Sequence, residues 1–300
     1  MATALGAPPA TASLPDRLRT TVAILERRGY AVGAARLGEL CLGGPVSPGQ
    51  VLAALPSAGL GQEQGLVTAG GLSHCTAAIA RRQAGHQLAA DRYRREAELF
   101  ARNLAAWCPF VIAVSIAGSL ASGGFRETDD VDLNLVVEDG HRHLAYVALN
   151  LLAVLHAVRH RRKPVDAHTA RPLVPRLMTA NLVLERADCF PLRRTDADMA
   201  YELLVAQPVV GGRFLAGAYR ANPRLGDQFP QLSLRPVAAD QTVRRRLPAW
   251  LFPACLDGPA RVLGRAAWRY MQWTRRGRPE ALDRVAFVRA TMHPYALFEE

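Results

Sequence analysis

The sequence predicts an α+β protein, in which a small mixed sheet with flanking helices lies between a helical N-terminal module and a helical C-terminal region. The clearest runs of β-forming residues lie mid-chain, at 110–117 and 131–137. The segments on either side mostly place apolar residues at helical spacing. Half of the 300 residues are apolar, which is enough for a sizeable core. The predicted parts are a disordered tail at 1–13, a module at 14–95, a core at 96–190 and a C-terminal region at 191–300.

The N-terminal module follows the element order of a winged helix. Residues 14–28 have the pattern of an amphipathic helix, and 34–42 form a second short helix. Ser47 and Pro48 begin a third, as N-cap and first-turn proline. Residues 65–68 then predict a strand, which a Gly-Gly turn follows. Such modules either bind DNA or pack inside a larger protein, and the pattern here favours packing.

The middle of the chain begins with one long helix, or two helices end to end, over 72–107, which stops before Pro109 because the residue preceding a proline disfavours helix. Residues 110–117 predict a buried strand, 118–128 a loop rich in Gly and Ser, and 131–137 a second strand.

The remaining elements are a helix at 143–159 and a third strand at 177–184. A further helix spans 196–207, with Asp196 at its start and Pro208 beyond its end. Helical patterns continue over 242–275, and 285–289 predict a final strand.

Composition narrows the class of protein. No apolar run reaches the roughly 18–20 residues that a membrane-spanning helix needs. The first residues lack the basic start and apolar centre of a secretory signal. The five cysteines are scattered without a CxxC pair, which argues against a zinc cage or a disulfide framework. We therefore expect a cytoplasmic, reduced protein without a membrane partner.

The net charge is +11, and Lys163 is the only lysine, so arginine supplies nearly all of the positive charge. A positive field favours polyanions such as nucleotides or RNA. A GC-rich genome also favours arginine codons, so an arginine-rich surface without such a partner is the alternative. The basic segment 159–163 fits either a contact with phosphates or the C-terminus of a helix.

One group of residues in the predicted core has the pattern of a phosphate- and metal-binding site. Gly118 and Ser119 directly follow the first strand, where a glycine permits close backbone approach and amides with a hydroxyl can hold phosphate oxygens. Asp130 and Asp132 lie two apart on the next strand, so both carboxylates share one face. Such a pair repels itself unless a cation lies between, and hard oxygen ligands suit Mg²⁺ or Mn²⁺. The alternative is a Gly-rich hairpin with two solvated aspartates.

This arrangement resembles the DNA polymerase beta-like nucleotidyltransferase superfamily, in which Gly-Ser after a strand precedes a loop of about ten residues and Asp-x-Asp. The resemblance implies a nucleotidyltransferase-type mixed sheet, Asp130 and Asp132 as metal ligands and catalytic residues, and Gly118 and Ser119 as ligands of a nucleoside triphosphate (NTP). The chain departs from the pattern at Asp129, where the family often has Ser.

The resemblance also implies a third carboxylate on a later strand, which binds metal or acts as a general base. Glu185, at the end of the third predicted strand, is the first candidate, and Asp166 is its rival. Without a third carboxylate the domain would be a degenerate, non-catalytic copy.

A wider resemblance covers most of the chain. It is to a group of bacterial nucleotidyltransferase-domain proteins with a winged-helix-like N-terminal part. The resemblance is carried by short pieces at Asn181, Asp196, Ala200 to Glu202, Gln207-Pro208 and Ala221 to Pro223. Met199 and Tyr201 depart from the group's pattern.

The predicted function is transfer of a nucleoside monophosphate from an NTP to an acceptor, with release of pyrophosphate. A small-molecule acceptor is the first hypothesis and a protein acceptor the second. The competing hypothesis is a nucleic-acid-binding or regulatory protein with a degenerate transferase domain. The residues do not identify the NTP or the oligomeric state.

Overall fold

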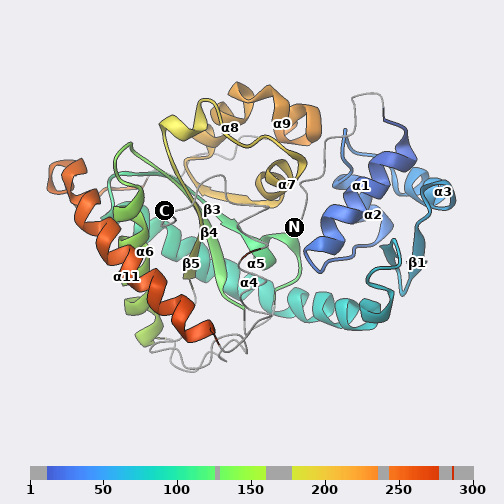
Figure 1. Cartoon of the computed structure of the whole chain (residues 1–300), viewed down its shortest axis with the longest axis horizontal. Coiled ribbons are helices and arrows are strands. Elements are labelled where there is room, and N and C mark those ends of the chain that lie inside the picture. Colours follow the sequence, from blue (N-terminus) through green and yellow to red (C-terminus); the bar gives the residue numbers. More distant parts are fainter. Residues whose placement is uncertain (1–11, 126–128, 160–177, 236–242, 277–285, 287–300) are drawn as a thin grey trace.

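A four-stranded mixed sheet forms the centre of the computed structural model, which describes residues 12–125, 129–159, 178–235, 243–276 and 286 (Figure 1). The strand order is β5-β4-β3-β6, with β3 antiparallel to β4 and β6, and β4 parallel to β5. The strands are β3 (Val111–Ala117), β4 (Val131–Val137), β5 (Met178–Glu185) and β6 (Gln207–Val210). The α+β class and three of these strands agree with the sequence analysis.

Strand β6 was not predicted, because Pro208 was interpreted as the residue that ends a helix. Proline cannot donate a backbone hydrogen bond, so it is tolerated mainly in an edge strand, and β6 is an edge strand. The loop predicted at 118–128 is likewise partly helical, because α5 (Gly118–Ser122) follows β3 directly.

The sheet buries both faces, since successive side chains of a strand point to opposite sides. On one face Val131, Leu133 and Leu135 of β4 pack in a core with α4 (Thr76–Trp107) and α6 (Arg142–Arg159). On the other, Val136 joins a core that includes the N-terminal helices and the segment that follows β5. The helices of that segment are α7 (Ala197–Val205), α8 (Gly212–Ala221), α9 (Pro223–Gln228) and α10 (Gln231–Leu234).

The last described helix, α11 (Asp257–Arg275), lies along α6 at the edge of the molecule (Figure 1). Short 3₁₀ turns complete the described chain at Ser73–Cys75, Ala187–Cys189, Ala249–Leu251 and Ala254–Leu256. No helix within the described ranges is long and apolar enough to cross a membrane. The predicted strand at 285–289 and the candidate carboxylate Asp166 lie outside those ranges, apart from residue 286.

The N-terminal module has the expected three helices and the strand at 66–68, which pairs with a strand that was not predicted, β1: α1 (Leu14–Arg27), α2 (Ala34–Glu39), α3 (Pro48–Ala58), β1 (Gly61–Glu63) and β2 (Leu66–Thr68). Ser13 and Ser47 cap α1 and α3 through their side chains, as predicted for Ser47. Helix α4 leads from this module to the sheet without a break (Figure 1), so the predicted boundary between 95 and 96 lies inside a continuous helix.

Candidate active site

The junction between β3 and α5 lies against Asp132. Ala117, the last residue of β3, pairs with Asp132 in the antiparallel ladder. Gly118 then turns the chain with a φ of 60°, and a Cβ at this position would lie 2.8 Å from Cγ of Asp132. Glycine is therefore required here both for its backbone conformation and for the space that the aspartate occupies. The result is a backbone turn at Gly118 and Ser119 beside the Asp132 carboxylate.

The environment of Asp132 opposes its ionisation. Burial raises the pKa of its carboxyl to about 7, helped by the negative charges of Asp130, Glu202 and Asp129. A hydrogen bond from Thr179 Oγ1 to Asp132 Oδ1, 3.0 Å long, acts in the opposite direction. A group of carboxylates in such surroundings favours either a proton or a cation.

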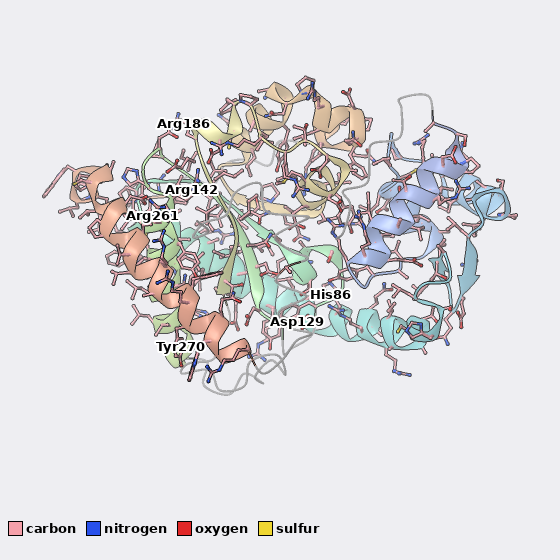
Figure 2. All side chains as sticks on the ribbon, viewed as in Figure 1. His86, Asp129, Arg142, Arg186, Arg261 and Tyr270 are labelled. Atoms are coloured by element: carbon pink, nitrogen blue, oxygen red, sulfur yellow. The ribbon has the colours of Figure 1, made fainter. Side chains whose placement is uncertain are left out.

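Asp129, the residue that departs from the family pattern, interacts with α4. Arg82 Nη2 lies 3.5 Å from Asp129 Oδ2, and Arg82 Nε donates to the Gly124 carbonyl of the same loop. His86, one turn further along α4, accepts from the backbone N–H of Phe125 (the region is labelled in Figure 2). The extra negative charge at 129 thus has a cationic partner on α4.

A row of polar side chains continues from Asp132 across the same sheet face. Asn181 on β5 donates to Asn134 Oδ1 at 2.8 Å and to Glu202 Oε1 at 3.0 Å. Glu202 projects from α7, is 3% exposed, and contributes to the raised pKa of Asp132. Asn181 and α7 therefore place a buried third carboxylate near the aspartates.

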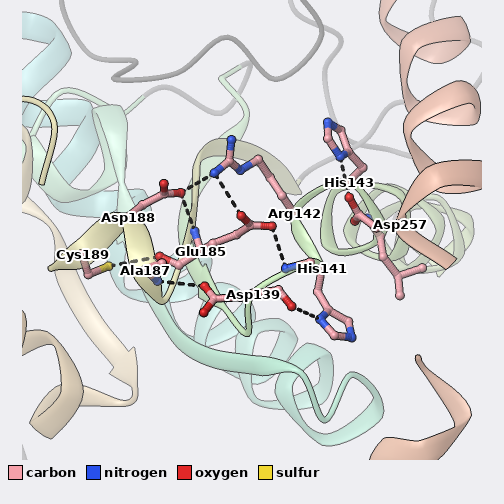
Figure 3. Close-up of polar contacts among 11 residues, drawn as sticks. Asp139, His141, Arg142, His143, Glu185, Ala187, Asp188, Cys189 and Asp257 are labelled. Atoms are coloured by element: carbon pink, nitrogen blue, oxygen red, sulfur yellow. Dashed lines mark hydrogen bonds and ion pairs between the residues drawn. The ribbon is translucent and has the colours of Figure 1, made fainter. Parts of the chain in front are cut away.

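Glu185 is not beside the aspartates, contrary to the sequence-based expectation. In the parallel register Asp132 pairs with Thr179, whereas Glu185 pairs with Val137, five residues along β4 and roughly 16 Å away at about 3.3 Å per residue. There Glu185 accepts from the Gly140 N–H at 3.0 Å and from Arg142 at 3.3 Å (Figure 3). Asp188 accepts from the same arginine. Glu185 thus belongs to a polar cluster that fixes the turn after β4.

Glu202 was present in the sequence analysis only as part of a short family-like motif. Its position on α7 follows Asp196, whose side chain caps the helix by accepting from Met199 N at 3.0 Å. The signal that could have identified Glu202 is a carboxylate inside an otherwise apolar helix, because a buried charge is rarely retained without a partner.

The described residues contain no group of three or more His, Cys, Asp or Glu side chains arranged as a ready-made metal cage. The carboxylates Asp130, Asp132 and Glu202 are instead related by charge and by the polar row between them. Comparisons of the chain with protein-family models, curated proteins and solved structures found no match.

Proposed function

We propose that this protein is a Mg²⁺-dependent nucleotidyltransferase that moves a nucleoside monophosphate from an NTP to a small-molecule acceptor. The observation that carries the proposal is the approach of the Gly118 turn to Asp132, with Asp130 on the same motif and Glu202 on the adjoining helix. The arrangement of β3, α5 and β4 around this turn supports a nucleotidyltransferase-type fold, and the small mixed sheet agrees with it.

The residues suit a divalent metal by the chemistry of their donor atoms. Carboxylate oxygens are hard ligands, and the raised pKa of Asp132 indicates negative charge that a cation would relieve. Asp130 and Asp132 would hold Mg²⁺ (or Mn²⁺), and Glu202 on α7 would add negative charge near them. A bound metal of this kind supplies charge neutralisation for the triphosphate.

The chain's own groups have separate roles in the proposed reaction. Backbone amides at Gly118 and Ser119, with the Ser119 hydroxyl, would hold phosphate oxygens. The acceptor oxygen or nitrogen forms a bond to the α-phosphorus while the bond to the bridging oxygen of the β-phosphate breaks, and pyrophosphate leaves with that electron pair. The proton of the acceptor hydroxyl or amine passes to water. Thr179 positions the Asp132 carboxylate, and Asn181 positions the Glu202 carboxylate, each through a hydrogen bond of 3.0 Å.

The acceptor class follows from the resemblance more than from the geometry. A cytoplasmic small molecule is the first choice and a protein the second. A degenerate domain is the less favoured alternative, because Glu202 supplies the third carboxylate whose absence would have indicated one.

Calorimetry with ATP, GTP, CTP and UTP, each with Mg²⁺, tests the proposal. We expect one or more nucleotides to bind the wild type, and the Asp130→Asn/Asp132→Asn double variant to lose at least tenfold in affinity. Circular dichroism verifies that the variant is folded. Absence of binding by folded wild type, or equal binding by the variant, contradicts the proposed function.

A further inference from the structure

A second polar site lies at the opposite end of β3, away from the carboxylates. A cavity of about 590 Å³ lies between the C-terminal end of α4 and the segment 243–246. Arginine dominates its lining, with Arg102 from α4 and Arg244, Arg245 and Arg246 from the segment. The cavity adjoins the start of β3 at Val111, and Gly118 follows its other end, so the two sites are roughly 20 Å apart along the strand.

Arg245 fixes the position of the segment. Its guanidinium donates to the carbonyls of Ala105 in the last turn of α4, of Cys108 directly after that helix, and of Val111 at the start of β3. The backbone N–H of Arg246 donates to Ala106 O at 2.8 Å. Cations are common at helix C-termini because they compensate the unpaired carbonyls, and Arg245 fills that role. The other arginines of the cavity are not needed for it.

The remaining positive charge is largely uncompensated. Among the described residues no carboxylate pairs with Arg244 or Arg246, while Glu98 pairs with Arg102 at 2.8 Å. The face of α4 that carries Arg102 continues to Arg95, seven residues earlier, which is exposed. A cavity with this much positive charge selects an anionic ligand.

An aromatic ring adjoins the arginines. Trp107, the last residue of α4, is 39% exposed, and the Arg246 guanidinium lies 5.0 Å from the centre of its ring. Indole and guanidinium planes stack on nucleobases, and guanidinium groups pair with phosphodiesters. Neither an inorganic anion nor an acidic peptide would use the ring in this way.

We propose that this cavity, together with the adjoining ring of Trp107, binds single-stranded nucleic acid, with Arg244 and Arg246 on the phosphodiester backbone and Trp107 stacked on a base. Nucleic acid at this site would bring an acceptor or a regulator to the protein without using the carboxylates of the candidate active site. The proposal therefore does not depend on the proposed transferase function.

Fluorescence anisotropy of a labelled mixed-sequence 12-nucleotide RNA, at several salt concentrations, tests the proposal. The Arg244→Gln/Arg246→Gln variant removes two cations and keeps Arg245. We expect at least a tenfold loss of affinity and a decrease of roughly 1.4 in the slope of log K against log salt, since each phosphate contact on a single strand contributes about 0.7. A second variant, Trp107→Leu, should weaken single strands more than a duplex of the same length.

The matched control is Arg220→Gln/Arg224→Gln, which removes the same charge from exposed positions on α8 and α9. We expect this control and Asp132→Asn to retain wild-type RNA affinity. Equal losses in the two arginine variants would indicate a non-specific charge effect and overturn the site. No binding by the wild type, or equally tight binding of poly-glutamate, would overturn it as well. The same measurement with a single-stranded DNA of the same length shows which of the two nucleic acids the site binds more tightly.

Discussion

The carboxyl group of Asp132 lies where burial and three neighbouring carboxylates all oppose its ionisation. Its pKa of about 7 exceeds the value near 4 of an aspartate in the unfolded chain. Between these two values the folded state holds a proton that the unfolded state releases. Stability from this group is therefore full below about pH 4 and decreases as the pH rises to 7.

Because ionisation of Asp132 lowers the stability of the folded protein, a neutral side chain at this position should stabilise it. In metal-free buffer at pH 8, Asp132→Asn should raise the free energy of unfolding by about 1–3 kcal/mol, because the amide removes a half-buried charge next to other carboxylates and keeps an oxygen for Thr179. Urea denaturation of both proteins at pH 8 and pH 5 measures the effect, which should shrink at pH 5. An equal or less stable variant at pH 8 would contradict this account of the site.

Glu202 and Glu185 form a matched pair for testing which carboxylate serves the site. Glu202→Gln keeps an oxygen for Asn181 but removes the charge near Asp132, so Mg-NTP affinity should fall about tenfold or more. Glu185→Gln weakens the contact with Arg142 at the far end of the strand and should leave nucleotide affinity unchanged. Calorimetry decides between them, and the reverse result would restore the sequence-based assignment of Glu185.

The strands on either side of the Gly-Ser and Asp-x-Asp motif could be predicted because local runs of β-forming residues determine them, and the role of the motif stays a proposal. The sequence did not reveal that Glu202 rather than Glu185 lies near Asp132, and part of the physical reason is in β5. The register shifts near Asn181, where Ala180 opposes Leu133 and Leu182 opposes Asn134. A bulge of this kind breaks the regular alternation of side chains along a strand, so the faces on which Asn181 and Glu185 lie do not follow from their spacing in the sequence. The contact between Asn181 and Glu202 joins residues 21 positions apart, and no local pattern reveals it.

At the scale of elements, the structure explains how α11 is held on α6. Asp257, the first residue of α11, accepts from the backbone N–H of Leu144 at 2.8 Å and from His143 Nδ1 at 2.7 Å, near the start of α6 (Figure 3). Burial acts to raise the pKa of Asp257, but these hydrogen bonds and the nearby imidazole hold it below its usual value. One carboxylate therefore caps one helix from the start of another.

Replacement of this carboxylate should loosen the pair of helices. Asp257→Ala is expected to lower the free energy of unfolding by about 1–2 kcal/mol at pH 7. The stabilisation by Asp257 is full above the unfolded pKa near 4 and is lost as the pH falls through the lower folded value. Asp227→Ala, at an exposed position of α9, is the control and should change stability by less than about 0.5 kcal/mol. Similar effects of the two substitutions in urea denaturation would show that the cap is unimportant.

The individual elements were the most predictable level of the structure. Apolar spacing and capping residues predicted the long helix that became α4, the Ser47 cap and the Asp196 cap, because these are local effects. Strand β6 could not be predicted, since four residues that include Pro208 form a strand only through pairing with β3.

At the scale of the whole molecule, a buried ionic contact joins the N-terminal module to the core. Asp198 on α7 accepts from Arg27 at 2.9 Å and from Arg28 at 2.8 Å, at the end of α1. Asp198 and Arg28 have side-chain exposures of 1% and 3%. Arg28 also lies over the buried Tyr201 ring, 5.0 Å from its centre. The arrangement supports an internal packing role for the module, one of the two roles that its sequence left open.

Removal of Asp198 would leave two arginines at this contact without their carboxylate. Asp198→Ala should lower the free energy of unfolding by about 3–5 kcal/mol, because an unpaired buried charge is strongly destabilising. Glu39→Ala removes one partner of the exposed Arg36 pair and should cost less than about 1 kcal/mol. Thermal unfolding of the two variants measures the difference, and equal midpoints would contradict a packed role for the module.

Mn²⁺ binding tests the central claim most directly, by water-proton relaxation with the α,β-methylene analogue of each NTP. Relaxation is enhanced when the ion is immobilised on the protein together with the nucleotide. We predict enhancement with wild type and with Glu185→Gln, and its loss with Asp132→Asn. Enhancement that persists in Asp132→Asn, or is absent from the folded wild type with all four analogues, would contradict a metal-dependent nucleotide site at these aspartates.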